Sequence, residues 1–310
     1  MKYPFLGAIL VSTSLWASFS EPTRWDYATG YRNDRLHWHL QNPGDGGALK
    51  YSEIYRDLQF WQNALSMTVY QRDIYFFLSG SYSAFGQGGK LRQRYGELDF
   101  TTEEPRFAFT PSGWAADGEA RLGYCVNLTD GRIYKTALIP FIGFSGHWES
   151  LSRRCFPPAI EVAPSTTMTS QLPGQLNLTW YGFLLGGMFH IDPAGPLLFD
   201  VGYYYSWLHV RFHTHYDYSI DSLSFSESIY NGIKAKSGGN LGHTGWIKAM
   251  YRITDAWQIG LGGLINYFVS RDFKAEERQL TSFGETTKTA EKLKIRWTAV
   301  SGWASISRSF

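Results

Sequence analysis

The sequence predicts an all-β protein, a transmembrane antiparallel β-barrel of about ten strands. The strongest observation is the last twelve residues, which form one alternating strand from Ala299 to the aromatic carboxy-terminus Phe310. Val300, Gly302, Ala304 and Ile306 fall on one face with Phe310, while the other face carries Trp303 among serines. A period of two suits a strand with one face toward lipid and one toward a polar lumen. Arg308 interrupts the apolar face near its end.

The other end of the chain has the pattern of an export signal. Met1 and Lys2 supply a short positive region, residues 4–15 an apolar run, and residues 18–20 the small side chains that a signal peptidase recognises. The sequence therefore predicts a signal peptide at residues 1–20 and a mature barrel at residues 21–310. After residue 20 no segment approaches the roughly 20 apolar residues of a spanning helix, so strands must do the spanning.

The composition agrees with a barrel and excludes one class of partner. Aromatic residues make up 17% of the chain, with 20 Tyr and 12 Trp, and the mean hydropathy is slightly negative. Barrels show this mixture because only alternate residues meet lipid and aromatic girdles mark both interfaces. The net charge of +2, without a basic run, argues against a nucleic-acid partner.

Short turns and long polar loops alternate along the chain. The four turn signals lie at 71–73, 129–131, 192–195 and 254–255, and the five long loops are predicted at 41–48, 86–118, 149–173, 213–239 and 270–290. Short turns on one rim and long loops on the other are typical of a bacterial outer-membrane barrel. An even number of strands places both mature termini on the turn side, in the periplasm.

The predicted strands lie between these turns and loops. They run over residues 25–40, 49–70, 74–85, 119–127, 132–148, 174–190, 197–212, 242–251, 257–269 and 292–310. The alternation is cleanest in the third, seventh and ninth segments. In the seventh it places Asp200 toward the lumen, which is where a carboxylate is tolerated.

Several stretches resemble the omptins, outer-membrane proteases built as ten-stranded barrels. Residues 29–40 and 51–60 resemble the first omptin hairpin, and residues 79–89 resemble the third strand with its entry into the second long loop. Residues 213–217, His-Thr-His-Tyr-Asp, fall where the family's fourth loop begins. The resemblance covers most of the mature chain in element order and loop length, and it implies the omptin fold.

The resemblance also implies a protease site, from which this chain departs. Omptins use a carboxylate pair in the second loop and an Asp-x-His pair in the fourth, which activate a water molecule. Here Glu97 and Asp99 match the first pair only if about three residues are inserted before them, and His215 stands at the histidine position. His213 replaces the orienting aspartate and cannot act as a fixed anion. Asp217 is the nearby carboxylate that offers compensation.

Strand register adds a second constraint on this candidate catalytic set. His213 and His215 share the parity of Tyr203 and Trp207, so they point outward unless a bulge re-aims them. The remaining interpretation is that Glu97, Asp99 and His215 are solvated loop residues.

Two further patterns each leave two interpretations open. One face of a predicted strand carries His209, Arg211, His213 and His215. These side chains form either a metal-binding patch or, as is more common, an exposed rim of the barrel. The alternating cations at 90, 92 and 94 suit lipopolysaccharide phosphates or a solvated face. The sequence predicts no metal ligand set and no cofactor.

These observations favour a porin-like or surface structural protein of a Gram-negative outer membrane. Its loops are expected to be extracellular, its state monomeric, and its partners outer-membrane lipid, including lipopolysaccharide, and the barrel-assembly machinery, through the C-terminal strand. A ten-stranded lumen is narrow, so any conductance is expected to be small. The alternative is an omptin-type aspartyl endopeptidase of the outer membrane.

Overall fold

The computed structural model describes residues 23–310, apart from short gaps. The gaps are residues 42–48, 72, 86–89, 96–97, 102–107, 110–111, 131–133, 154, 157–159, 164–165, 170–173, 194, 223–225 and 282–283. The predicted signal peptide at residues 1–20 lies outside the described residues. Within them, no helix is long and apolar enough to cross a membrane.

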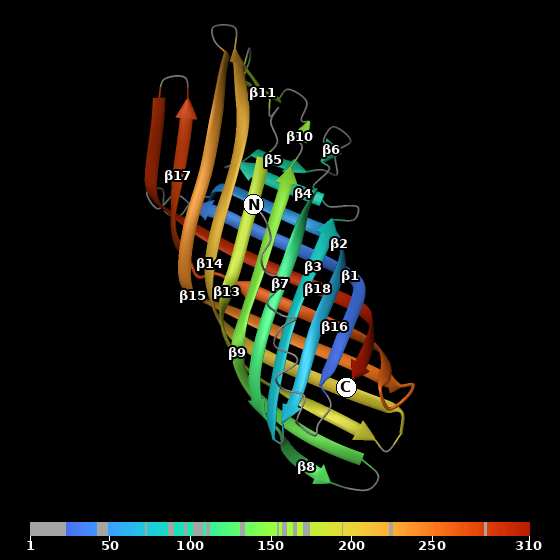
Figure 1. Ribbon diagram of the computed structural model, residues 1–310. Coiled ribbons are helices and arrows are strands. Elements are labelled where there is room, and N and C mark those ends of the chain that lie inside the picture. Colours follow the sequence, from blue (N-terminus) through green and yellow to red (C-terminus); the bar gives the residue numbers. More distant parts are fainter. Residues whose placement is uncertain are drawn as a thin grey trace.

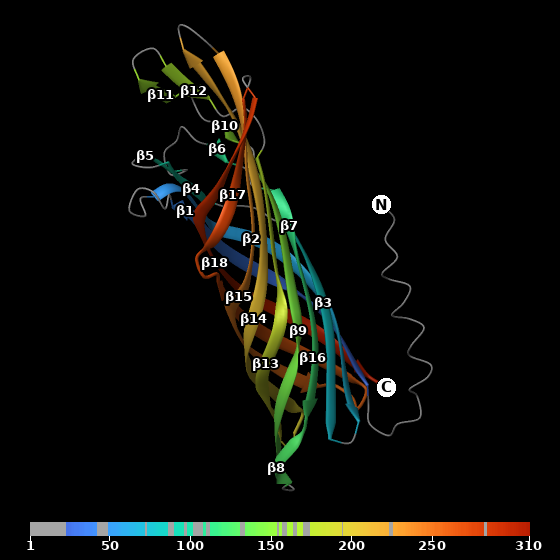
Figure 2. The same ribbon diagram turned by 90° about the vertical axis from the view of Figure 1, so that its left-hand side faces the viewer.

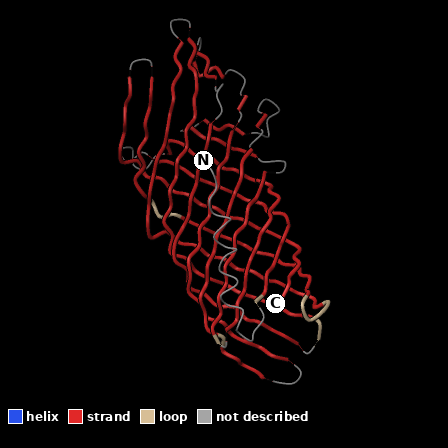
Figure 3. The backbone as a smooth tube through the Cα atoms, viewed as in Figure 1, coloured by secondary structure: helices blue, strands red, loops and turns tan. Residues whose placement is uncertain are grey.

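Ten long antiparallel strands close into a tall barrel (Figures 1 and 3). In order around the barrel they are β1 (Arg24–Gln41), β2 (Leu49–Gln71), β3 (Ile74–Phe85), β7 (Ser112–Tyr124), β9 (Tyr134–Arg153), β13 (Gly174–Pro193), β14 (Leu197–Ser222), β15 (Ser226–Arg252), β16 (Trp257–Val269) and β18 (Gly284–Ser309). The last strand pairs with the first from Arg24 opposite Ser309 to Gln41 opposite Lys292, which closes the sheet. The predicted fold class is confirmed.

The short connections all lie at one end of the barrel, here called the turn end. They join β2 to β3, β7 to β9 through β8 (Val126–Asp130), β13 to β14, and β15 to β16. These are the four turns predicted from the sequence. The C-terminus lies at this end too, where the amide of Phe310 donates to the carbonyl oxygen of Thr23.

The opposite end, here called the loop end, contains more strand than the sequence predicted. The predicted loop 213–239 is largely the extension of β14 and β15, and the predicted loop 270–290 holds β17 (Phe273–Thr281) and the start of β18. Shorter pieces are β4 (Lys90–Tyr95), β5 (Leu98–Thr101), β6 (Ala108–Phe109), β10 (Cys155–Phe156), β11 (Ile160–Ala163) and β12 (Thr166–Thr169). Figure 2 shows β11 and β12 beside the projecting ends of β14 and β15.

Side chains change polarity between the two halves of the barrel. Toward the turn end, apolar side chains point outward and polar ones inward; on β1, Tyr27 and Tyr31 are exposed while Asp26 and Arg32 are buried. The outward set forms an apolar belt that includes Leu65, Leu122, Ile142, Phe183, Val201, Ile247, Leu261, Ile265, Val300 and Ile306. The alternation predicted for the C-terminal strand is confirmed.

Toward the loop end this polarity is reversed. On β1, three apolar side chains point inward and are fully buried: Leu36, Trp38 and Leu40. Arg35, which directly precedes them, points outward and is exposed. The inward side chains form one hydrophobic cluster, here called the apolar plug, with members from β1, β2, β7, β9, β13, β14, β15, β16, β17 and β18. The rings of Trp38 on β1 and Phe212 on β14 approach to 5.0 Å across the lumen, so the plug fills the barrel from wall to wall.

Two bulges set which side chains face the lumen at the loop end. On β2 the register with β1 shifts between Asp34 and Leu36, where Arg56 and Asp57 are exposed and Asp57 has a φ of 56°. The one extra residue on β2 turns Tyr55 inward. On β15 the pairing shifts opposite Leu208 and Val210, so the one extra residue belongs to β15 and β14 keeps its parity.

Candidate functional site

Charged side chains cross the lumen below the apolar plug. The central one is Arg32 of β1, whose side chain is 1% exposed. Its Nε and Nη2 donate to the two carboxylate oxygens of Asp34 at 2.7 and 2.8 Å, and its Nη1 donates to Asp117 Oδ2 on β7 at 2.6 Å. A guanidinium suits this position because it holds two carboxylates in fixed directions at once.

The second member of this layer is His147 of β9, which lies against the opposite wall. Its Nδ1 is 2.7 Å from Asp117 Oδ1, and its ring lies 4.2 Å from that of Trp297 on β18. Asp117 also accepts from Ser81 at 2.8 Å and from Gln62 at 3.3 Å. Five strands therefore meet at one carboxylate or its direct partners, and we call Arg32, Asp34, Asp117, His147 and Glu149 the central network.

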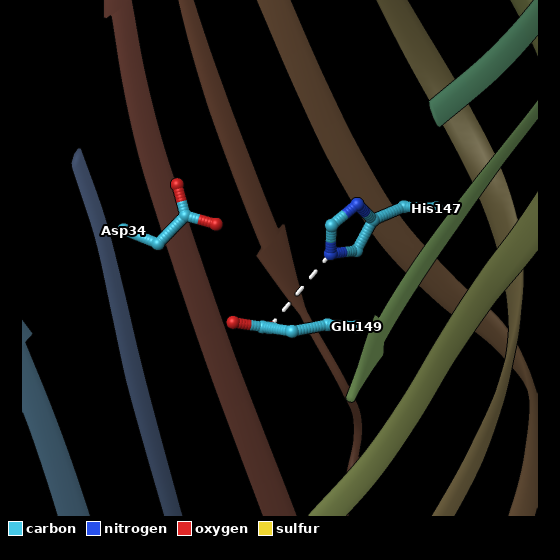
Figure 4. Close-up of side chains that lie close together, drawn as sticks. All are labelled: Asp34, His147 and Glu149. Atoms are coloured by element: carbon cyan, nitrogen blue, oxygen red, sulfur yellow. Dashed lines mark ion pairs between the residues drawn. The ribbon is translucent and has the colours of Figure 1, made fainter. Parts of the chain in front are cut away.

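Glu149 is the member whose charge the described residues leave least compensated. Its side chain is fully buried on β9, and neither of its carboxylate oxygens makes a hydrogen bond within the described part of the chain. An ionisable neighbour is His147, whose Nε2 lies 3.8 Å from Glu149 Oε2. Figure 4 shows Asp34 reaching from β1 toward His147 and Glu149 on β9.

A second charged layer lies closer to the turn end. Arg121 of β7 pairs with Glu119 on its own strand and lies among four aromatic rings from four other strands. Its guanidinium carbon is 4.1 Å from the ring centre of Trp246, 4.7 Å from Phe77, 4.9 Å from Phe141 and 5.3 Å from Tyr204. Because Trp246 lies on β15, opposite β7, this aromatic cage spans the lumen.

A third layer closes the turn end. Lys248 of β15 donates to Asp26 of β1 at 2.9 Å, and Arg24 contacts Asp26 at 3.4 Å and Asp200 at 3.9 Å. Asp200 also lies 2.6 Å from Nδ1 of His190. The inward position predicted for Asp200 is confirmed, since this residue is 4% exposed.

A cavity of about 220 Å³ lies among these layers. Small side chains line much of it, including Gly30, Ala64, Gly118, Ser301 and Ser305. A water molecule needs only roughly 10–15 Å³ of such space, so the cavity has room for several. Arg32, Asp117 and His147 border it from the central network, and Arg24 and Lys248 from the turn-end layer.

The structure places part of the predicted omptin-type set. His213 and His215 lie on the outward face of β14, because Phe212 and Thr214 beside them point inward. Their ring centres are 6.1 Å apart. Asp99 lies on β5 and Asp217 on β14, but their side chains fall outside the description, as does all of Glu97. Convergence of Glu97, Asp99 and His215 stays a prediction.

Of the other histidines and cations singled out from the sequence, the structure describes the side chains of some and not of others. His209 stacks on Tyr181 with ring centres 5.6 Å apart, and Arg211 lies 5.3 Å from the same ring. Both project outward from β14. The side chains of Lys90, Arg92 and Arg94 on β4 lie outside the described residues.

The central network was not predicted, although its members share one signal. Arg32 and Asp34 on β1, and His147 and Glu149 on β9, are polar residues two apart on a barrel strand. Such spacing puts both side chains on one face. The predicted strands began at residue 119 and stopped at residue 148, which left Asp117 and Glu149 in loops.

Chemically, the central network is a set of buried acids and one imidazole, shielded from the loop end by the apolar plug. An Asp–His pair such as Asp117 and His147 orients an imidazole nitrogen as a base or as a metal ligand. Proteolysis requires a polypeptide to reach that nitrogen. The plug, with Trp38 and Phe212 in contact across the lumen, separates it from the loop end.

Comparison with known proteins agrees with this architecture. The family model described as "Pom: Protochlamydia outer membrane protein" matches residues 26–310. No curated protein matches the chain. Among solved structures, the outer membrane protease OmpT from Escherichia coli is similar with a TM-score of 0.67 at 10% identity, covering 93% of this chain and 97% of that one. The omptin likeness therefore holds for the fold.

The chain is also similar, more distantly, to a barrel of another outer-membrane protein. The translocator domain of the autotransporter NalP from Neisseria meningitidis gives a TM-score of 0.36 at 12% identity, over 97% of this chain and 93% of that one.

Replacing Arg32 with methionine is expected to destabilise the barrel by about 3–5 kcal/mol, because the buried carboxylate of Asp34 would keep its charge without its ion-pair partner and Asp117 would lose one of its partners. Arg35→Met is the matched control, since Arg35 is exposed on the outward face of the same strand. We expect the control to change stability by less than about 0.5 kcal/mol. Urea unfolding of the refolded proteins measures both. Equal stability of the two variants would show that the central network does not hold the barrel together.

Proposed function

The chain belongs to the Protochlamydia outer membrane protein family, and from this premise we propose that it is a surface structural barrel whose lumen is closed by its own side chains. The observation that supports this most directly is the apolar plug, which fills the loop end with contacts from wall to wall. The central network and the aromatic cage add two charged layers below it. Ten strands enclose a narrow lumen that such side chains can fill.

The proposed orientation puts the turn end in the periplasm and the loop end outside the cell. Bacterial barrels have short periplasmic turns and longer outer loops, and this chain has the same asymmetry. In this orientation β14, β15, β17 and β18 project away from the membrane. The structural role proposed here is to present those projecting strands on the cell surface.

A porin-like role is the second candidate, and the interior cavity is the observation that favours it. The cavity of about 220 Å³ already joins the central network to the turn-end layer. A path through the barrel requires that the apolar plug open above it. The two candidates therefore differ in whether the plug is closed in the membrane.

In a planar bilayer the refolded protein is expected to give no long-lived conductance step. Arg121→Ala and Trp246→Ala are each expected to leave it silent, because the apolar plug remains. Combining these two substitutions with Trp38→Ala and Phe212→Ala, which thins the aromatic cage and the plug together, is expected to produce measurable current. Arg308→Ala serves as control, since this side chain lies outside against Trp257 and Phe310. Steady current through the unaltered protein would favour the porin-like candidate.

The endopeptidase alternative is tested with peptide substrates and lipopolysaccharide. We expect no cleavage by the unaltered protein, nor by His215→Ala or Asp99→Ala, because His213 and His215 project from the outward face of β14. Cleavage that both substitutions abolish would instead establish an omptin-type site at the loop end.

Outer-membrane lipid is the proposed partner of a basic face above the apolar belt. On β1 and β18 this face consists of Arg35, His37, His39, Lys292, Lys294 and Arg296. Burial, with His39 and Arg296 nearby, lowers the pKa of His37 to about 4, so this imidazole is neutral at pH 7 and the arginines and lysines carry the charge. Cations just above a bilayer suit the phosphates of an anionic headgroup such as that of lipopolysaccharide.

Adding lipopolysaccharide to the refolded barrel is expected to raise its melting temperature at low ionic strength, and less so in high salt. Lys294→Glu combined with Arg296→Glu should abolish most of that increase. Lys135→Glu, an exposed lysine near the turn end, is the matched control and should retain it. An increase that survives the double substitution would exclude this face as the lipid contact.

A further inference from the structure

Asp34, His147 and Glu149 place a potential ligand set for a metal ion inside the barrel. Each offers one ligand atom, and these three atoms lie within 4.8 Å of one another. All three residues are buried, at 0%, 2% and 2% exposure. No other group of three or more histidine, cysteine or carboxylate ligands is found within the residues that the structure describes.

The unsatisfied atoms of this cluster point to a ligand. His147 Nε2 and both carboxylate oxygens of Glu149 are buried and make no hydrogen bond to any described residue. A buried carboxylate without hydrogen bonds is costly, so such groups are normally paired or coordinate a metal. The unsatisfied atoms face each other, with 3.8 Å between His147 Nε2 and Glu149 Oε2.

The other side of the His147 ring fixes which nitrogen is available. Nδ1 lies 2.7 Å from Asp117 Oδ1, a distance at which a ring N–H donates to the carboxylate. The neutral imidazole then has its proton on Nδ1 and a lone pair on Nε2. Two acceptors would therefore face each other at Nε2 and Oε2, which a cation between them resolves. An Asp–His–metal arrangement of this kind is common around bound zinc.

The charge of the central network also leaves room for a cation. Three carboxylates, Asp34, Asp117 and Glu149, surround the single guanidinium of Arg32, so with a neutral imidazole the network carries two excess negative charges. A divalent ion balances them. Asp34 already accepts one hydrogen bond from Arg32 on each oxygen and a third from Trp297 Nε1 on Oδ2. A carboxylate has about four lone-pair positions, which leaves one on Oδ1 for the ion.

We propose that Asp34, His147 and Glu149 bind one divalent transition-metal ion, with zinc as the best fit. One imidazole with two carboxylates suits zinc, whereas calcium and magnesium prefer oxygen ligands alone. Zinc bonds of about 2.0–2.2 Å separate tetrahedral ligand atoms by about 3.3–3.5 Å, so the side chains need only a small inward movement. Water from the cavity, which His147 borders, supplies the remaining ligand.

The ion would join two strands that are not neighbours. Asp34 belongs to β1, while His147 and Glu149 belong to β9, and three strands separate them on the shorter way around the barrel. A metal bond across the lumen would stabilise the closed interior. This inference concerns the interior ligands alone and does not depend on whether the barrel conducts.

The test is zinc binding by the full-length barrel refolded in detergent, with Zn²⁺ alone as the probe. After removal of loosely bound metal, one zinc per barrel is expected by elemental analysis, and competition with a chromophoric chelator gives the affinity. Cobalt substitution should give the visible spectrum of a site with nitrogen and oxygen ligands. Zinc should also raise the melting temperature, and a chelator should reverse the increase.

Glu149→Gln keeps the shape of the side chain but removes its charge, and His147→Gln removes the imidazole; each is expected to weaken zinc binding at least about tenfold. Asp117→Asn, which leaves all three proposed ligands in place but changes the hydrogen-bond partner of His147 and the ion pair with Arg32, should weaken it by about 10–100-fold. The matched control combines His213→Ala with His215→Ala, because exposed histidines also attract zinc. The control should leave the stoichiometry unchanged.

Three results would overturn the proposal: no zinc retained by the unaltered barrel, zinc retained equally by Glu149→Gln, or zinc lost only in the His213 and His215 control. If an interior variant does not refold, the reversible zinc-dependent melting temperature and the cobalt spectrum of the unaltered barrel decide the question. A melting temperature indifferent to zinc, together with a spectrum of oxygen ligands only, would reject the site.

Discussion

The buried guanidinium of Arg32 is the constraint on which the barrel interior depends. It is one cation held among several carboxylates inside the barrel, and a buried charge is tolerated only when its partners are fixed. Its partner Asp117 lies on β7 and contacts His147 on β9, so this layer links the position of β1 to those of β7 and β9. The apolar plug lies above this layer and the aromatic cage below it.

The sequence predicted the number and order of the barrel strands because apolar and polar residues alternate clearly in the half of the barrel at the turn end. Along β18 and the residue after it, the outward face carries Val300, Ile306 and Phe310, and the inward face carries Ser301, Ser305 and Ser307. The difference in polarity between the two faces is large enough to be read from the sequence alone. The loop end was predicted less well. There the inward residues become apolar and the outward ones charged, so segments such as 213–222 resemble polar loop although they are strand.

The candidate site was missed for a related reason. When charge is taken as a sign of loop, Asp117 and Glu149 mark the ends of strands, yet both are interior residues. Recognising them requires continuing the inward alternation of each strand further, from Arg121 back to Asp117 on β7 and from His147 on to Glu149 on β9. The pairing of these residues across the lumen depends on the closed sheet and cannot be obtained from local pattern.

The outward position of His213 and His215 on β14 depends on a bulge in the neighbouring strand β15. Gly239 of β15 has a φ of 72°, a conformation that glycine adopts easily, and the one extra residue at this position belongs to β15. β14 therefore continues without a change of face. Had the bulge formed on β14, the same two imidazoles would have pointed into the plug.

The reversal of polarity along each strand also determines the depth at which the protein sits in its membrane. On β1 the change occurs within the few residues between Tyr31 and Arg35, and on β14 between Trp207 and Arg211. Displacement of the barrel toward its turn end would carry guanidinium groups into hydrocarbon, and displacement toward its loop end would strip lipid from the exposed leucines and isoleucines. Both movements cost free energy, so the side chains of the barrel wall favour one depth in the membrane.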